Sequence, residues 1–546
     1  MINANVLNLF DQTIQQAEVR FENGRIVSIV ARGKENPSLP YLLPGFVDAH
    51  VHIESSMLTP AQFARLAVVH GTVATVSDPH EIANVLGVPG VEYMIQDGKR
   101  VPFKFCFGAP SCVPATAFET AGATVSPKDV RRLLGMKEIG YLAEMMNFPG
   151  VLNEDPDMMA KLRLAQAFNK PIDGHAPGLR GEAARRYAEA GISTDHECFT
   201  YEEAREKIDY GMHILIREGS AARNFEALIP LLAEFPNRIM FCSDDKHPDN
   251  LVEGHINLLV KRALAKGHKL FDVLQAACLN PVLHYRLPVG LLREGDAADF
   301  IVVDNLSDFT VLRTYLNGEI VAENGQSLLP DLRSEHINQF NCTPKSPDDF
   351  TCLAPGDTSA VRVIEALEGQ LITNALLEPV TPVQGVVQAD PARDLLKITV
   401  VNRYQDTAPA VAFIRNFGLK SGAIASSVGH DSHNIVAVGC DDESICQAVN
   451  LLIEAKGGVA AVGKGEQHVL ALPIAGLMTD QTGYEVANHY TSIDKFVKNQ
   501  LGSTLQSPFM TLSFMALLVI PSLKLSDKGL FDGDRFQFVS TFGKIG

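Results

Sequence analysis

The alternation of apolar and polar positions along the chain changes its period several times and so divides the chain into regions. Residues 1–40 follow the two-residue period of short strands. The pair Asn23-Gly24 between residues 18–22 and 25–30 predicts a tight hairpin turn, because Asn and Gly adopt positive φ readily. We expect residues 1–40 to form the first part of a small β domain.

From residue 41 to residue 284, a span of 244 residues, apolar runs alternate with stretches such as 181–190 and 201–210 that predict helices. Eight strand–helix units in about 250 residues predict an α/β fold of the (β/α)8 TIM-barrel type. An open doubly wound sheet is the alternative, but no Gly-x-Gly-x-x-Gly follows the first strand. The predicted strands are residues 45–52, 72–78, 103–109, 139–145, 171–175, 192–196, 213–218 and 239–244.

Strand patterns return at residues 285–335, where residues 289–304 and 311–320 predict strands and a turn is predicted at Asn317-Gly318. We expect these strands to pair with residues 1–40, so that both flanks of the barrel build the small β domain.

Residues rich in Pro, Ser and Asp near 329–358 predict a linker. Residues 336–546 then form a C-terminal α+β domain in this interpretation. Its predicted strands are 396–401 and 435–438, and its predicted helices are 445–455 and 485–498.

Composition and charge exclude several classes of protein. A net charge of −17 and a pI near 5.4, with no basic cluster, argue against a nucleic-acid partner. The nine Cys residues follow no Cys-x-x-Cys spacing, which is typical of a reducing compartment. The apolar run 509–520 is too short to span a bilayer and predicts a core element, and the first residues do not resemble a secretion signal. We therefore expect a cytoplasmic protein with no membrane contact.

The first predicted barrel strand ends in a candidate metal site. His50 and His52 are two residues apart, so on a strand their imidazoles share one face and can bind one divalent ion together. Paired His residues also occur by chance in exposed loops, and His50-x-His52 alone does not decide between the two interpretations. The apolar run 46–51 before and around the pair favours the metal site.

Further potential ligands lie at the ends of later predicted strands. Any single one of them has an ordinary explanation, such as a hydrogen-bonded core residue or, for Asp244, a helix cap. Together with the His pair they provide four imidazoles and two carboxylates, a mixed N/O set that suits two ions of Mn, Fe or Zn better than Ca or Mg. These residues are Glu144, His175, His196 and Asp244.

Several strings in the sequence resemble the amidohydrolase superfamily, in particular Pro-Gly-Phe-Val-Asp-x-His-x-His and Gly-Asp-Ala-Ala-Asp-Phe-Ile-Val-Val. Within that superfamily the chain is similar to the adenine deaminase family over nearly its whole length. The strings that carry this closer resemblance are residues 52–57, 77–84, 145–150, 243–245 and 426–434.

The resemblance implies hydrolytic deamination of adenine to hypoxanthine and ammonia, in purine salvage or catabolism, with two divalent ions, Mn or Fe before Zn. It implies that His50, His52 and Asp244 hold one ion. It also implies that Glu144 bridges while His175 and His196 hold the other ion. Asp244 would take the proton from the attacking water and pass it to the substrate.

The roles of other polar residues are less determined by the resemblance. We assign His80 to catalysis beside Asp244 and Glu144, although Asp78-Pro-His-Glu81 also fits a simple helix start. A helix is predicted at residues 252–265, where His255 would pack or hydrogen-bond. Glu54, Asn147, His430 and His433 are assigned to substrate binding; for the last two, the alternative is a surface loop.

Two other functions remain open at this point. One is an amidohydrolase that acts on a cyclic amide or on another aminopurine, because fold and metals would be the same. The other is a barrel without activity, which is disfavoured because all six candidate ligands are present. Adenine is a neutral small molecule and needs no basic patch, and by analogy with related barrels we expect a homodimer.

Overall fold

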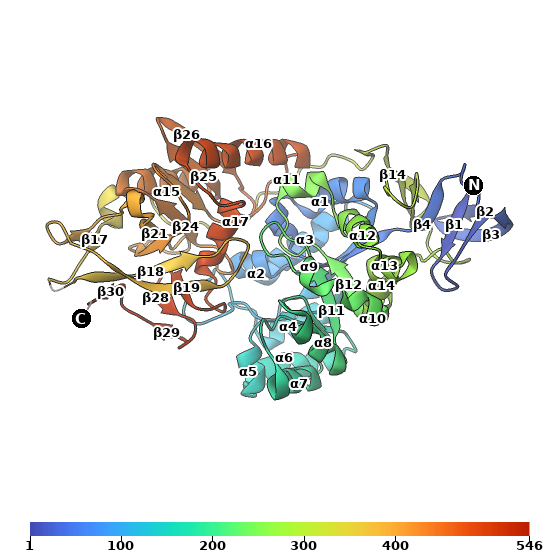
Figure 1. Cartoon of the computed structure of the whole chain (residues 1–546), viewed down its shortest axis with the longest axis horizontal. Coiled ribbons are helices and arrows are strands. Elements are labelled where there is room, and N and C mark those ends of the chain that lie inside the picture. Colours follow the sequence, from blue (N-terminus) through green and yellow to red (C-terminus); the bar gives the residue numbers. More distant parts are fainter. Residues whose placement is uncertain (357, 545–546) are drawn as a thin grey trace.

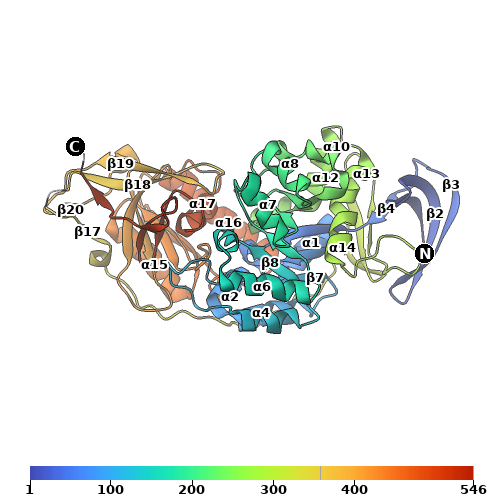
Figure 2. The same cartoon turned by 90° about the horizontal axis from the view of Figure 1, so that it is seen from below.

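The computed structural model describes residues 1–356 and 358–544, which form three bodies in a row along the longest axis (Figure 1). A β-sheet with the N-terminus lies at one end, a barrel lies in the middle, and a C-terminal domain lies at the other end. The view from below shows the same order (Figure 2).

The barrel contains every strand predicted for residues 41–284. Several strands end earlier than predicted, so that His175 and His196 directly follow β9 and β10, and Asp244 lies two residues after the end of β12. The strands are β5 (Phe46–Val51), β6 (Thr72–Ser77), β7 (Lys104–Ala109), β8 (Ile139–Met145), β9 (Ile172–Gly174), β10 (Thr194–Asp195), β11 (His213–Arg217) and β12 (Ile239–Cys242).

These strands run parallel in two hydrogen-bonded groups, β5 to β9 and β10 to β12, which close on each other at two seams. At one seam the Ser193 N–H donates to the Ile172 carbonyl at 2.9 Å. At the other the Asp244 N–H donates to the His50 carbonyl, also at 2.9 Å. The closed barrel is confirmed and the open doubly wound sheet is excluded, since an open sheet would leave two free edges.

Helices surround the barrel. The two helices predicted at residues 181–190 and 201–210 are α7 (Gly181–Glu189) and α8 (Tyr201–Asp209). The others are α1 (Pro60–Ala67), α2 (His80–Leu86), α3 (Val88–Gly98), α4 (Pro127–Leu134), α5 (Phe148–Leu152), α6 (Pro156–Ala167), α9 (Phe225–Leu228), α10 (Leu231–Glu234), α11 (Pro248–Glu253), α12 (Ile256–Ala265), α13 (Leu270–Leu274) and α14 (Asn280–Tyr285).

The continuous helix predicted at residues 252–265 is wrong, because the chain breaks between α11 and α12. His255 lies at this break. Its Nε2 is 2.7 Å from Asp48 Oδ2 and its Nδ1 is 2.7 Å from the Thr72 hydroxyl. These two buried hydrogen bonds tie the break to β5 and β6, so the expected hydrogen-bonding role of His255 is confirmed.

Both flanks of the barrel contribute to one eight-stranded sheet in the order β16-β15-β14-β13-β4-β1-β2-β3. The predicted hairpin is present, with Asn23 and Gly24 at φ 51° and 76° between β2 and β3. The strands are β1 (Ile2–Asn8), β2 (Thr13–Glu22), β3 (Arg25–Lys34), β4 (Tyr41–Pro44), β13 (Phe300–Val303), β14 (Val311–Leu316), β15 (Glu319–Glu323) and β16 (Gln326–Ser327).

The C-terminal domain is built on a nine-stranded sheet, and its helices include α15 (Asp442–Ala455), α16 (Gly483–Phe496) and α17 (Pro508–Ser513). The predicted strands and helices of this region are all present. The sheet contains β18 (Ala360–Ala366), β19 (Thr373–Pro379), β21 (Leu396–Val401), β22 (Ala410–Arg415), β23 (Ala423–Ser426), β24 (Ile435–Gly439), β25 (Gly458–Gly463), β26 (Glu466–Ala471) and β30 (Phe542–Gly543).

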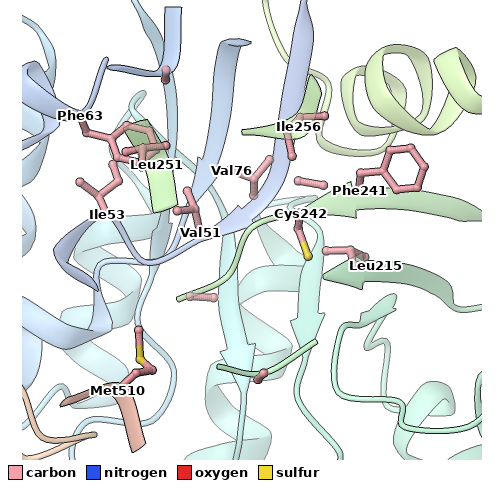
Figure 3. Close-up of a cluster of buried hydrophobic side chains, with 14 of the residues drawn as sticks. Val51, Ile53, Phe63, Val76, Leu215, Phe241, Cys242, Leu251, Ile256 and Met510 are labelled. Atoms are coloured by element: carbon pink, nitrogen blue, oxygen red, sulfur yellow. The ribbon is translucent and has the colours of Figure 1, made fainter. Parts of the chain in front are cut away.

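The apolar core is continuous between the barrel and the C-terminal domain. Barrel residues such as Val51 and Ile53 belong to the same buried cluster as Met510, which comes from the predicted core element at 509–520 (Figure 3). Phe514 of the same element also belongs to this cluster. This shared core holds the C-terminal domain against the mouth of the barrel. Among the described residues, no helix has the length and apolar character needed to cross a bilayer.

Candidate metal centre

The two imidazoles of the His-x-His motif converge at the end of β5. All six residues of the strand are buried, and the alternation of the strand places His50 and His52 on one face. Their Nε2 atoms are 3.2 Å apart. Two ring nitrogens this close inside a protein indicate either a shared proton or a shared cation.

Glu144 on β8 connects this pair to two further imidazoles. Its Oε1 is 3.4 Å from His52 Nε2, and its Oε2 is 2.8 Å from His175 Nδ1 and 3.1 Å from His196 Nε2. The two carboxylate oxygens therefore face different imidazoles, which is the arrangement that a bridging ligand requires.

Asp244 completes the cluster from the end of β12. Its backbone is in the left-handed region at φ 53°, where a non-Gly residue is uncommon. The bonds to β5 hold it there: its N–H donates to the His50 carbonyl, and its own carbonyl accepts the His52 N–H at 3.3 Å. As a result Asp244 Oδ1 lies 3.4 Å from His52 Nε2 and 3.7 Å from His50 Nε2.

The six candidate ligands fit a divalent-metal centre. None is more than 6% exposed, and their nitrogen and oxygen atoms fall into groups whose members lie within 4.8 Å of one another. One group is His50, His196 and Asp244, and another is Glu144, His175 and His196. Four imidazoles and two carboxylates suit Mn, Fe or Zn.

The pKa values of Glu144 and His50 are shifted in the directions that favour metal binding. Burial raises the pKa of the Glu144 carboxyl, but His175 and the other imidazoles outweigh it and hold the pKa well below the usual value. Burial and the neighbouring imidazoles of His196 and His52 lower the pKa of His50, so His50 is neutral. The centre thus offers ionised carboxylates and a neutral His50, the forms that bind metal. At the other three imidazoles, His52, His175 and His196, the neighbouring carboxylates outweigh burial and raise the pKa, so a bound metal would have to displace protons there.

Arg217 and Glu197 belong to the site but were not predicted. The Arg217 guanidinium donates to both oxygens of Glu197, with one of these bonds at 2.9 Å, and to Asp244 Oδ2 at 2.7 Å. Burial opposes ionisation of Asp244, but the charge of Arg217 prevails and keeps its pKa well below the usual value. The signal was present in the sequence, because Arg217 ends the seventh barrel strand and Glu197 follows His196.

The C-terminal domain closes the mouth of the barrel. The pocket over the six ligands is also lined by His430, Asp431, Phe514 and Leu517. The His430 ring stacks on Phe514 with centroids 4.9 Å apart. His430 and His433 are buried, so their loop is not a surface loop but packs against the barrel.

The remaining predicted site residues lie at different distances from the six candidate ligands. His80 begins α2, lines the pocket and places its Nδ1 3.4 Å from Glu144 Oε1. Glu54 is buried, and its Oε1 accepts the Ile82 N–H at 3.2 Å. Asn147 is half-buried and uses its Oδ1 to accept the Gly150 N–H at the start of α5.

Comparisons with known proteins cover both the barrel and the C-terminal domain. Residues 41–321 match the amidohydrolase family, and residues 370–537 match the adenine deaminase C-terminal domain. The chain is 57% identical over 540 residues to adenine deaminase from a Sulfurovum species, with 99% of each chain covered. It is 55% identical to adenine deaminase from Salinibacter ruber (99% and 98% covered) and 53% identical to that from Methanosarcina mazei (96% of each).

Proposed function

Because this chain belongs to the adenine deaminase family of the amidohydrolases, we propose that it hydrolyses adenine to hypoxanthine and ammonia. One observation carries the proposal. The domain that matches the adenine deaminase C-terminal domain supplies His430, Asp431, Phe514 and Leu517 to the pocket above the six candidate metal ligands. A substrate in that pocket touches the family-specific domain and the hydrolytic centre together.

The six ligands are proposed to hold two divalent ions, Mn or Fe before Zn. His50, His52 and Asp244 would hold one, and His175 and His196 the other. Glu144 would serve both, which agrees with its two oxygens facing different imidazoles. When bound, such ions supply Lewis acidity that makes water a nucleophile at neutral pH.

Asp244 is proposed to move the proton in the reaction. Its Oδ2 is held by Arg217, which fixes the orientation of the carboxylate, and its Oδ1 faces the imidazole pair, where the ion and the reacting water would lie. Water adds to C6 of adenine, and Asp244 takes one proton of that water and passes it to the ring nitrogen. The remaining hydroxyl proton passes to the amino group as the C6–N bond breaks. Ammonia then leaves and hypoxanthine forms.

Arg217 is proposed as a positioning residue in this scheme, since it contacts Asp244 and Glu197. Phe514 and Leu517 give the pocket an apolar wall suited to the face of a purine. The assignments of Glu54, Asn147, His430 and His433 to substrate binding and of His80 to catalysis stay predictions. So do the homodimer and the cytoplasmic location.

The deciding experiment is ammonia release from adenine by purified protein, with and without added Mn²⁺, together with metal analysis of the same sample. Metal-dependent formation of hypoxanthine supports the proposal. Bound metal without turnover of adenine would contradict it and would favour another aminopurine or a cyclic amide as the substrate.

A further inference from the structure

We propose that the substrate enters through a second cavity between the barrel and the C-terminal domain, and that Leu371 separates this cavity from the catalytic pocket. The route rests on the proposed function, because the molecule that takes it is the purine. We call the second cavity the outer cleft. The residues that line it include Phe199, Glu218, Arg223, Asn224, Gln370 and Ile372.

The catalytic pocket is too small to admit a purine in the conformation of this structure. It encloses about 30 Å³, which is room for about two water molecules, and a purine is several times larger. The outer cleft encloses about 730 Å³, within the range of roughly 300–1,000 Å³ found for small-molecule sites. A purine can therefore occupy the outer cleft first, and part of the wall between the two cavities has to move before the purine reaches the metal ligands.

The two cavities share one wall. Three segments of the chain place residues on both of its sides. Glu197, Arg217 and Leu371 line the catalytic pocket. Phe199, Glu218 and both sequence neighbours of Leu371 line the outer cleft. The outer cleft therefore lies directly behind the catalytic pocket.

The barrel side of this wall is fixed by Asn224. Its side chain is buried, and its Oδ1 accepts the Arg217 N–H at 2.8 Å. Its Nδ2 donates to the carbonyls of His196 at 3.0 Å and Cys198 at 3.2 Å. Opening the wall on this side would break three buried hydrogen bonds and leave their donors and acceptors unsatisfied, which is costly.

The C-terminal side of the wall is a short turn. Leu371 lies in the turn of residues 367–372 between β18 and β19, and its side chain is buried in the core that the two domains share. Lys524 holds the turn from behind, because its Nζ donates to the Leu371 carbonyl at 2.6 Å and to the Phe514 carbonyl at 3.0 Å. The turn lies outside the paired positions of the two strands. It can shift without the loss of a strand pair, so we assign the opening of the wall to Leu371.

The charges and rings of the outer cleft suit a neutral purine. Two Glu and two Arg line it, and their formal charges cancel. Arg262 pairs with Glu218 at 2.6 Å and with Glu226 at 2.7 Å, and its guanidinium lies 4.1 Å from the centre of the Phe225 ring. The Arg262 side chain is still 39% exposed. A planar guanidinium that is accessible from a cleft can stack on an aromatic base.

The experiment measures access to the catalytic pocket without turnover. Leu517→Cys places a thiol in that pocket, and its alkylation by iodoacetamide in the full-length protein is followed by peptide mass spectrometry. Leu371→Ala and Ile372→Trp are each added to this variant. Leu377→Trp is the matched control, because Leu377 belongs to the same hairpin and is exposed like Ile372 (47% and 37%) but lies outside the outer cleft.

We expect Ile372→Trp to slow alkylation at position 517 at least about tenfold, since entry rates among variants of one site span about one to three decades. Leu371→Ala should accelerate it by a similar factor, and Leu377→Trp should leave it unchanged. An unchanged rate in Ile372→Trp overturns the route, and an unchanged rate in Leu371→Ala overturns the role of Leu371.

Adenine turnover by the single variants gives a second test that does not need Leu517→Cys to fold. The kcat/KM for adenine should fall in Ile372→Trp and stay normal in Leu377→Trp, and a normal value in Ile372→Trp overturns the route. A wild type that does not turn over adenine contradicts the proposed function instead, and the alkylation rates then still decide the route.

Discussion

Replacing Asp244 by Asn tests the proposed proton transfer with little change of shape. Arg217 donates to Oδ2 of this residue at 2.7 Å and needs an acceptor there. The Asn side chain has only one acceptor oxygen, so Arg217 will hold that oxygen and turn the NH2 group towards His50 and His52. A donor then occupies the position where Asp244 Oδ1 now lies 3.4 Å from His52 Nε2.

The magnitude follows from the role. Positioned acids and bases contribute about 10²- to 10⁴-fold to a rate. This corresponds to roughly 3–5 kcal/mol of barrier, at about 1.4 kcal/mol for each tenfold change. We expect the kcat of D244N for adenine to fall by at least about 10²-fold, with further loss from weaker metal binding. The assay is hypoxanthine formation by protein reconstituted with Mn²⁺, reported together with metal content.

A control variant separates a loss of catalysis from a loss of stability. Asp299 is also buried and ion-paired, in its case to Lys104, but it lies outside the pocket. D299N should lose stability and keep its kcat. The reasoning about Asp244 is refuted if D244N, with normal metal content, turns over adenine within tenfold of the wild type.

Other substitutions test separate parts of the structure. His50→Ala should lower bound metal, and unchanged content would remove His50 from the ligands. Phe514→Ala removes the ring that is proposed to contact the face of the purine. Such an aromatic contact is worth about 0.5–1.5 kcal/mol, so the KM for adenine should rise about 2- to 12-fold. A change confined to kcat would contradict a binding role. Burial lowers the pKa of Lys524 from 10.5 to about 7. Between pH 7 and 10 the unfolded chain therefore binds one more proton than the folded chain. The free energy of unfolding then rises by about 1.4 kcal/mol per pH unit. As pH rises, the melting temperature of the wild type should therefore increase relative to that of Lys524→Met. A difference between the two melting temperatures that does not change with pH would refute this.

The periodic parts of the fold could be predicted from the sequence because they depend on local patterns. The run Phe46–Val51 is apolar at four of its six positions, which predicts a buried strand, and Asn23-Gly24 forms its turn through the φ preferences of two residues. The continuous helix at 252–265 was wrong because His255 bonds to Asp48 and Thr72, partners about 200 positions away. Local helix propensity gives no information on such contacts.

The same distinction holds at the site. The six metal ligands follow strand ends, and a barrel brings strand ends together, so their convergence could be predicted. Asp431 and Phe514 could not be placed there, since nothing local indicates that their domain docks on the mouth of the barrel. Arg217 was missed for another reason. A positive guanidinium is not expected beside bound cations, and only the structure shows that it pairs with the carboxylates of Glu197 and Asp244.

The sheet shared by both flanks of the barrel also has a consequence for synthesis. β4 pairs with β1 on one side and with β13 on the other, and 256 positions separate Pro44 from Phe300. At about 5–20 residues per second on the ribosome, β4 waits roughly 13–50 s for this second neighbour. During that time the apolar residues Leu42 and Leu43 have no cover from β13. The nascent chain therefore exposes an unpaired strand edge for nearly half of its elongation, and chaperones that bind such edges should associate with it before residue 300 emerges.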